Sequence, residues 1–225
     1  MLRIFLFSFL LSACTTPQMS NVEWAGEAQK ITTMQDIADN AFLSELTNGK
    51  HLFALGPAGQ LEGEITVIDG KCFFAQLDAQ NNVGVREDCS LKAPYLVYGY
   101  FPTWRAARIN RELKKMRDLT RNITEILIEN GIITEEPSAL LLEATVGSLN
   151  YHIVKKGGQE IPLEIKDKKI TILGFYSKNH GGIFIKKGQN LHLHFISEDQ
   201  TASGHINDFV IKPGTKVKVY FPRKY

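Results

Sequence analysis

Residues 190–209 have the sequence NLHLHFISEDQTASGHINDF and hold three of the six histidines of the chain. Polar and apolar residues alternate at its start, which predicts a β-strand with His192 and His194 on one face. A polar turn follows, and Gly204 precedes His205 at the start of the next apolar run. A hairpin would therefore place His205 beside the other two imidazoles.

Three imidazoles at this spacing favour a metal site over three polar residues that happen to share a strand. Neutral imidazole nitrogens bind zinc at about 2.0–2.1 Å, and three protein ligands leave a coordination position open, as in catalytic zinc sites. Nickel, cobalt, iron and copper accept the same ligands, because affinity alone does not select zinc. We therefore expect His192, His194 and His205 to bind Zn²⁺ or another divalent transition metal.

The composition is that of a globular protein. Of the 225 residues, 44% are hydrophobic and 22% are charged, which excludes an intrinsically disordered chain. The formal net charge of +2 is too small to indicate a nucleic-acid-binding protein. A basic stripe lies on a helix expected at 103–130 and could meet nucleic acid or an anionic surface. Acidic residues interleave with it, so we expect a solvated face and no nucleic-acid partner.

The first fourteen residues, MLRIFLFSFLLSAC, have the pattern of a secretory signal. One basic residue precedes an apolar run that is too short to span a bilayer as a mature helix. The ending LSAC fits the bacterial lipobox, in which the cysteine is lipidated; a plain secretory peptide is the alternative. We expect a signal peptide at 1–14, a tether at 15–33, and an exported protein. Its lipid anchor at Cys14 would hold it in the outer membrane, facing the periplasm, unless the chain is secreted.

Cys72 and Cys89 form an even pair once Cys14 is set aside. In an exported protein such a pair indicates a disulfide. Asn81 and Asn82 lie between them, where a hairpin turn would bring two strands together. Two buried free thiols are the alternative, and we expect the disulfide.

Local periodicity predicts an α+β protein. Apolar residues recur at helical spacing over 34–46 and again over 103–130. Most other segments alternate and break at glycines, which predicts short strands in mixed or antiparallel sheets. We expect one domain over 34–225, with β-rich halves at about 34–136 and 137–225 that the long helix bridges. The expected strands are 52–55, 61–68, 72–77, 93–101, 140–146, 149–154, 161–165, 169–175, 183–185, 190–196, 205–211 and 216–221.

The histidine segment resembles the metal-binding end of the bacterial alpha-acetolactate decarboxylases. In that family a strand ends in glycine–phenylalanine, and a loop, H-x-H-F, an acidic turn and G-H follow, with an aspartate and an aromatic residue shortly after. At these places the chain has Gly174-Phe175, His192-Leu193-His194-Phe195, Glu198-Asp199, Gly204-His205 and Asp208-Phe209.

The first half of the chain is similar to the same family. Glu62-Gly63-Glu64 corresponds to the family's D-G-E strand, and Asp69-Gly70 to its second D-G turn. The aromatic strand APYLVYGYF and the long helix follow in the family's order. The resemblance covers about residues 34–211, and its histidine motif is specific.

The resemblance implies metal-dependent decarboxylation of 2-acetolactate, a small 2-hydroxy-3-oxo acid, to acetoin and carbon dioxide. The metal would stabilise an enediolate. His192, His194 and His205 would hold the ion. Glu64 matches the family's site glutamate and would act as a proton relay; a strand glutamate that faces solvent is the alternative.

Two features depart from the family's pattern. Where the family has an arginine, this chain has Lys155 or its neighbour Lys156, and a lysine keeps the charge but loses the bidentate grip on a carboxylate. We assign Lys155 as the second catalytic residue. The family's C-terminal glutamate has no counterpart, so Glu143, Glu198 or Asp199 would replace it, or catalysis would be altered.

Two other functions are compatible with the sequence. A cupin-like metalloenzyme would use the pattern H-x-H-x-x-x-E with Glu198 as a ligand, but the chain lacks the further downstream histidine that cupins need. A lipoprotein that kept the metal ligands and lost catalysis could bind a metal or a small ligand. The sequence also leaves a homodimer open.

Overall fold

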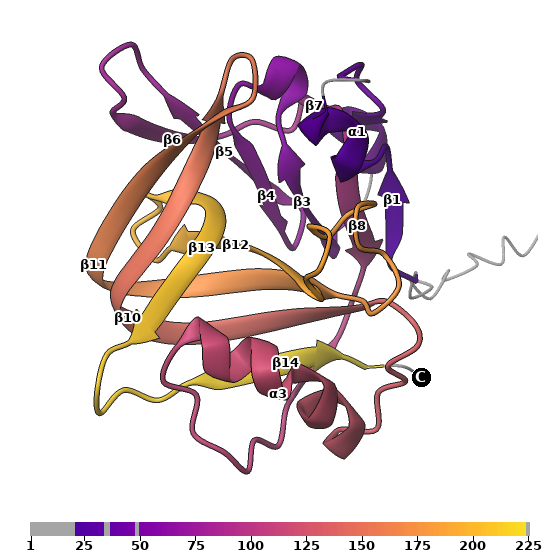
Figure 1. The fold of residues 1–225 in the computed structure, drawn as a ribbon, viewed down its shortest axis with the longest axis vertical. Coiled ribbons are helices and arrows are strands. Elements are labelled where there is room, and N and C mark those ends of the chain that lie inside the picture. The colour runs from indigo at the N-terminus through magenta and orange to yellow at the C-terminus, as the bar shows by residue number, and fades with distance from the viewer. Residues whose placement is uncertain (1–20, 34–36, 48–49, 224–225) are drawn as a thin grey trace, which may run out of the picture.

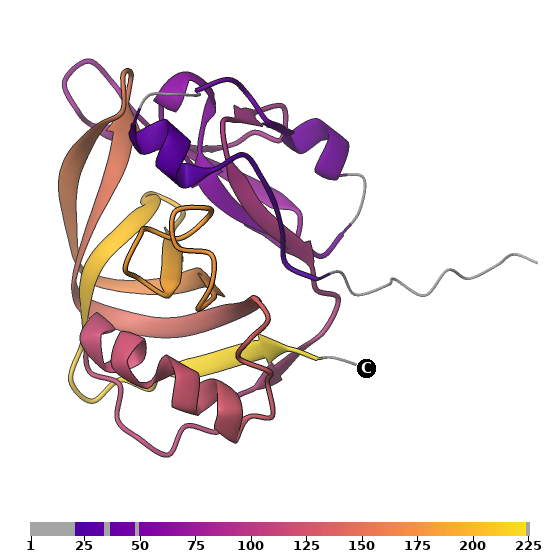
Figure 2. The ribbon, with the colours of Figure 1, turned by 45° about the vertical axis from the view of Figure 1, so that its right-hand side comes forward.

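The structure is a computed structural model and describes residues 21–33, 37–47 and 50–223. Two six-stranded sheets pack against each other, and one long helix lies against the second sheet (Figure 1, Figure 2). The predicted α+β class is confirmed, and the strand pairs of both sheets are antiparallel. The signal peptide and lipidated cysteine that we predicted at 1–14 lie outside the described residues.

The first sheet contains the strands of the N-terminal half. Its central strands are apolar and buried on both faces, because one face packs against small N-terminal elements and the other against the second sheet. In sheet order the strands are β1 (Glu23–Ala25), β8 (Leu96–Tyr100), β3 (Leu52–Pro57), β4 (Glu64–Ile68), β5 (Lys71–Leu77) and β6 (Val83–Glu87). The small elements are α1 (Ala28–Thr32), β2 (Ala41–Phe42), α2 (Leu43–Leu46), a 3-10 turn (Gly59–Leu61) and β7 (Lys92–Ala93).

The second sheet contains a closed ring of four strands. β10 (Ser138–Lys155) and β11 (Gln159–Tyr176) form a long hairpin, and β11 pairs with β12 (Leu191–Ser197). β12 pairs with β13 (Ser203–Ile211), which returns to β10. The ring therefore gives β12 and β13, which carry the three histidines, a partner on each side. β14 (Lys218–Pro222) and β9 (Trp104–Ala106) extend the sheet from β10.

Helix α3 (Met116–Glu129) packs against the second sheet. Leu119, Ile123, Ile126 and Leu127 recur at helical spacing, are fully buried, and share one apolar cluster with residues of β10, β12 and β13. Asp118 fixes the start of the helix by accepting hydrogen bonds from two preceding backbone N–H groups at 3.0 and 3.1 Å. Within the described residues no helix has the length and apolar character needed to cross a bilayer.

The helix predicted over 34–46 is wrong over most of the part that the structure describes. Only Leu43–Leu46 is helical, because Ala41 and Phe42 pair with β7 as a short strand. Ile37 is 42% exposed. The helical spacing of apolar residues therefore did not mark one buried face.

The helix predicted over 103–130 begins thirteen residues later than expected, at Met116. Trp104–Ala106 instead pairs with β14 at the edge of the second sheet. The chain thus changes sheets between Tyr100 and Trp104, before the boundary that we predicted near residue 136. Because α3 packs on the second sheet, it does not bridge the two halves.

The tether predicted over 15–33 is too long. Glu23–Ala25 pairs with β8, and the backbone N–H groups of Ala28 and Gln29 donate to the carbonyls of Ile183 and Gly182 at 2.6 and 2.8 Å. Residues from Glu23 onward therefore belong to the fold, and residues 15–20 lie outside the described part.

The predicted strands of the second half follow the observed order, with two differences. β10 and β11 each cover two predicted strands, because they pair with each other in one register from Ser138 opposite Tyr176 to Lys155 opposite Gln159. The strand predicted at 183–185 is instead a turn, with a single bridge between Gly181 and Ile185.

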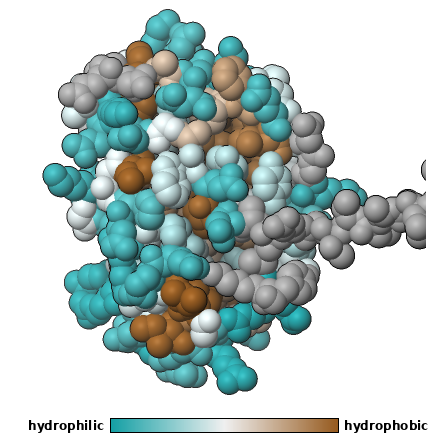
Figure 3. All heavy atoms as spheres, turned by 90° about the vertical axis from the view of Figure 1, so that its right-hand side faces the viewer, coloured by the Kyte–Doolittle hydropathy of each residue, from teal (hydrophilic) through white to brown (hydrophobic). Residues whose placement is uncertain are grey.

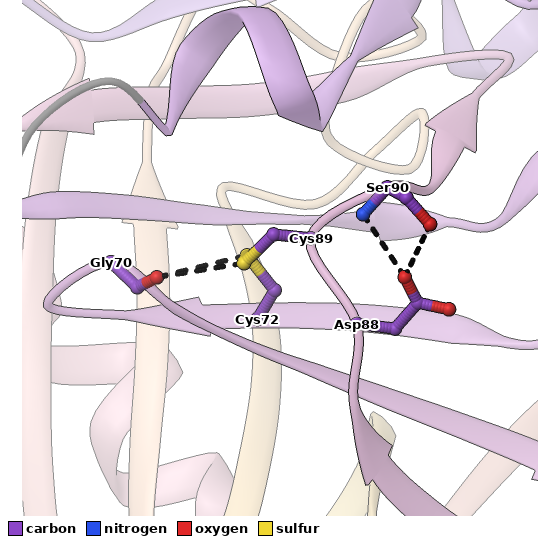
Figure 4. Close-up of a disulfide and its surroundings, with 5 residues drawn as sticks. All are labelled: Gly70, Cys72, Asp88, Cys89 and Ser90. Atoms are coloured by element: carbon purple, nitrogen blue, oxygen red, sulfur yellow. Dashed lines mark hydrogen bonds between the residues drawn. A yellow bond between two sulfur atoms is a disulfide. The ribbon is translucent and has the colours of Figure 1, made fainter.

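The predicted disulfide between Cys72 and Cys89 is confirmed. It joins the start of β5 to the residues after β6, and Figure 4 shows both sulfur atoms near the Gly70 carbonyl oxygen, at 3.7 Å. Beside it, Asp88 accepts hydrogen bonds from the backbone N–H and the hydroxyl of Ser90 at 3.0 and 2.6 Å. The bridge thus closes the predicted hairpin of β5 and β6.

Candidate metal centre

The three histidines predicted as metal ligands lie together, next to β4 of the first sheet. His192 and His194 are on β12, and His205 on β13 is the direct cross-strand partner of His194. The ring centroids are 4.7 to 5.3 Å apart. Nε2 of His192 lies 3.1 Å from Nδ1 of His205, and one ring nitrogen of each residue lies within 4.8 Å of the others. The structure therefore brings the three predicted ligands together.

Backbone carbonyls orient two of the three rings. Nδ1 of His192 donates to the carbonyl of Phe184 at 2.7 Å, and Nδ1 of His194 donates to the carbonyl of Ile65 at 3.0 Å. Each bond places the proton on Nδ1 and leaves the lone pair on Nε2. Because Ile65 belongs to β4, the first sheet helps to orient a histidine of the second sheet.

The three imidazoles are neutral at physiological pH. Burial lowers the pKa of His192 to about 4 and lowers the pKa of His194 and His205 well below the usual value of 6.5. A buried imidazolium loses its hydration, and each charged ring would also repel its neighbours. The lone pairs are therefore available without prior loss of a proton.

Glu64 opens β4 and faces His194. It is 2% exposed, so the solvent-facing alternative for this residue is wrong. One carboxyl oxygen lies 3.6 Å from Nε2 of His194, and the other accepts a hydrogen bond from the backbone N–H of Val154 at 3.3 Å. Burial raises the pKa of Glu64 to about 8. The carboxyl group is therefore mainly protonated at neutral pH.

His152 lies beside the site, although it was not among the predicted site residues. It is buried on β10, opposite His205, and the two rings stack with centroids 4.5 Å apart. Its Nδ1 donates to the side-chain oxygen of Asn207 at 2.8 Å. Only the pairing of β10 with β13 brings these residues together, and no local pattern in the sequence indicates it.

Lys155, the second predicted catalytic residue, lies at the end of β10. Its Nζ donates to the side-chain oxygen of Asn81, in the turn between β5 and β6, at 2.8 Å. Within the described residues no hydrogen bond or ion pair joins Lys155 to the three histidines. Its catalytic role stays a prediction.

The acids that could replace the family's C-terminal glutamate lie away from the histidines. Glu198 pairs with Lys169 and Asp199 with Lys168, both in the exposed turn between β12 and β13. Glu143 pairs with a lysine of β14. The cupin interpretation requires Glu198 to face the metal, and its place in the turn argues against that interpretation.

The residues present fit a divalent transition metal. Nε2 of His194 is buried and has no hydrogen-bond partner among the described residues, an arrangement that costs free energy unless another group binds the lone pair. Two nitrogens bound tetrahedrally to zinc lie about 3.3 Å apart, close to the 3.1 Å between His192 and His205. The hydrogen bonds at Nδ1 are the outer contacts that metal-binding histidines usually make.

Comparison with known proteins points to one family. A sequence model described as alpha-acetolactate decarboxylase matches residues 31–222. The alpha-acetolactate decarboxylase of Brevibacillus brevis is 26% identical over 163 residues, which cover 68% of this chain and 54% of that protein. That of Methanosarcina mazei is 26% identical over 176 residues, which cover 72% of this chain and 57% of that protein. The chain thus spans little more than half the length of these relatives.

Solved structures share the fold. The alpha-acetolactate decarboxylase of Bacillus subtilis strain 168 superposes with a TM-score of 0.67 at 18% identity, covering 91% of this chain and 86% of that one. A Staphylococcus aureus protein, described as of unknown function and similar to alpha-acetolactate decarboxylase, gives 0.65 at 15% identity, covering 91% and 85%. Because the family match extends over most of its length, the chain belongs to the alpha-acetolactate decarboxylase family.

Proposed function

We propose that this chain decarboxylates 2-acetolactate to acetoin and carbon dioxide, with a divalent transition metal held by His192, His194 and His205. The observation that carries the proposal is the set of three neutral imidazoles beside the buried carboxyl of Glu64, in a chain of this family. Zinc is our first choice of metal, because three histidines with an open coordination position are a common zinc site.

The histidines would hold the metal through ring nitrogens that already lie near one another. Their low pKa keeps the lone pairs free, and the carbonyls of Phe184 and Ile65 fix the ring planes of His192 and His194. A bound ion supplies a Lewis acid that stabilises the negative charge of the enediolate left when carbon dioxide departs.

Glu64 would supply the proton that the reaction consumes. Decarboxylation breaks the bond between a carbon atom and the carboxylate, and a proton must replace the lost group. With its pKa raised to about 8, Glu64 carries a proton at neutral pH, and it lies 3.6 Å from the ring of His194. A buried acid with a pKa near the working pH is suited to this transfer.

Lys155 would bind the substrate carboxylate once its side chain turned away from Asn81. The amine is now hydrogen-bonded to that residue in the neighbouring turn. The alternative is a protein that kept the metal ligands, lost catalysis, and binds a metal or a small ligand.

We also propose that the chain is exported and lipidated at Cys14, in the outer membrane with the domain facing the periplasm. The leader sequence at 1–14 supports export. The disulfide between Cys72 and Cys89 supports it independently, because such bonds persist mainly in oxidising compartments.

The test is release of acetoin from 2-acetolactate by the purified full chain, with and without zinc. We expect zinc-dependent acetoin and an equal amount of carbon dioxide. His194→Ala should lose zinc and fall to the uncatalysed background. Glu64→Gln should keep zinc and lose about 10²–10⁴-fold in rate, the usual contribution of a general acid. Stoichiometric zinc binding without acetoin would instead support a binding protein.

A further inference from the structure

The outer side of α3 carries a basic and apolar stripe that the proposed function does not use. Arg117, Arg121 and Ile128 lie within about 40° of one another around the helix. All three are exposed, Ile128 by 60%. The glutamates near the end of α3 pair with Arg111. Neither Arg117 nor Arg121 takes part in an ion pair within the described part of the chain.

A cavity of about 480 Å³ lies beyond the end of α3, next to Asn130 and Gly131. Arg105 and Arg223 line this cavity, and Asn21, the first described residue, lines it too. Arg105 donates to the backbone carbonyl of Asn130 at the end of α3, and neither cavity arginine has an ion-pair partner among the described residues. Ile133, next to the cavity, is 56% exposed.

The position of Asn21 limits how far this surface can lie from a membrane. Six residues separate Cys14 from Asn21. A fully extended chain spans at most about 3.5 Å per residue, so a lipid on Cys14 would hold Asn21 within about 25 Å of the bilayer. The cavity lined by Asn21 would therefore stay within reach of the membrane surface.

We propose that this surface rests on anionic phospholipids. The docking face consists of Arg105, Arg117, Arg121, Ile128, Ile133 and Arg223. Arginine binds phosphate groups with paired hydrogen bonds, and exposed isoleucines between basic residues are typical of helices that lie in the membrane interface. Figure 3 shows hydrophobic residues gathered at the height of α3 and bordered by hydrophilic ones. The inference rests on the proposed lipidation of Cys14 and is independent of the proposed catalysis.

The test uses the full acylated chain in vesicles of phosphatidylcholine, with or without phosphatidylglycerol. Ile133→Cys supplies the one free thiol for a fluorophore, because Cys14 carries lipid and Cys72 and Cys89 are bonded. A nitroxide-bearing lipid then quenches any fluorophore that lies at the membrane. The control carries the same fluorophore at position 156, on Lys156→Cys, in the exposed turn between β10 and β11.

We expect quenching at position 133 to be about twofold or more greater when phosphatidylglycerol is present, since each basic side chain near an anionic surface adds attraction. The label at position 156 should show no such dependence. Arg117→Gln with Arg121→Gln removes two of the four arginines of the docking face and should clearly reduce the difference. Glutamine suits an exposed helix as well as arginine does. Lys166→Gln with Lys169→Gln removes the same charge from β11 and should leave the difference intact.

Three results would overturn the docking face: equal quenching in both lipid mixtures, unchanged quenching in the Arg117→Gln/Arg121→Gln variant, or a mass spectrum showing no lipid on Cys14. Acetoin release by the same vesicles separates the two proposals. An acylated chain that forms acetoin but shows no dependence on phosphatidylglycerol disproves docking and leaves the proposed decarboxylation standing.

Discussion

The two ends of the β12–β13 hairpin differ in burial and in charge. At one end His194 and His205 are cross-strand partners, and His194 has no exposed surface. At the other end the turn exposes Glu198 and Asp199, which pair with two lysines of β11. The same pair of strands thus carries neutral rings at one end and charged groups at the other.

Burial explains this difference. It lowers the pKa of His194, because an imidazolium between two sheets has no hydration. At the turn, hydrogen bonds from Lys168 and neighbouring hydroxyl groups lower the pKa of Asp199 and keep it charged. The buried end can therefore offer lone pairs to a metal, whereas the exposed end holds ion pairs that contribute little to stability.

Glu64 provides the strongest test of the buried end. The metal-free folded protein binds a proton at Glu64 up to a pKa of about 8, whereas the unfolded chain releases it near 4.5. Stability should therefore fall as pH rises between these values. The histidines contribute in the same way to both proteins, so Glu64→Gln should remove a loss of about 1.6 kcal/mol between pH 6.5 and 8.

Denaturant unfolding of the metal-free wild type and the Glu64→Gln variant at pH 6.5 and pH 8 measures this effect. The buried histidines act in the opposite direction, because their lowered pKa makes stability fall as pH drops below 6.5 in both proteins. Parallel pH curves for the two proteins above pH 6.5 would show that Glu64 is not protonated in the fold.

His152 tests how far the buried site extends. Its ring stacks on His205 and is held by Asn207. His152→Ala should lower zinc affinity about tenfold, the lower end of the range for residues that support metal ligands. His152→Phe keeps a ring that can stack on His205, so it should lower zinc affinity less than His152→Ala does. Competition titration with a zinc chelator measures both affinities. The control is His51→Asn, a half-buried histidine that is hydrogen-bonded to Asp69 and is not among the histidines of the site. Equal affinity in His152→Ala and wild type would place His152 outside the site.

The hairpin that carries His192, His194 and His205 could be predicted from the sequence, because residues close together in the chain determine it. Alternation placed His192 and His194 on one face, and a short turn limited where His205 could lie. Glu64 came only from the resemblance to the family. Its distance to His194 depends on how the two sheets pack, which no spacing encodes. The same holds for His152, whose place opposite His205 depends on the register of β10 with β13.

The errors in the fold have a common physical cause. Ala41 and Phe42 have helical neighbours in sequence, yet β7 offers them a strand partner. Trp104–Ala106 likewise pairs with β14, more than a hundred residues away. In both segments tertiary pairing overrides a weak local preference. The core of α3 was predicted correctly, because its apolar stripe matches one buried face over four turns.

Substitution of Glu198, at the exposed end of the β12–β13 hairpin, should have the smallest effect on stability and activity. Its pair with Lys169 is solvent-exposed, so Glu198→Gln should change the free energy of unfolding by less than about 1 kcal/mol. Zinc affinity and acetoin release should not change, because the side chain lies in the turn and not at the histidines. A clear loss of zinc from Glu198→Gln would mean that the turn folds back onto the metal. The two ends of the hairpin would then form one site, as the cupin interpretation requires.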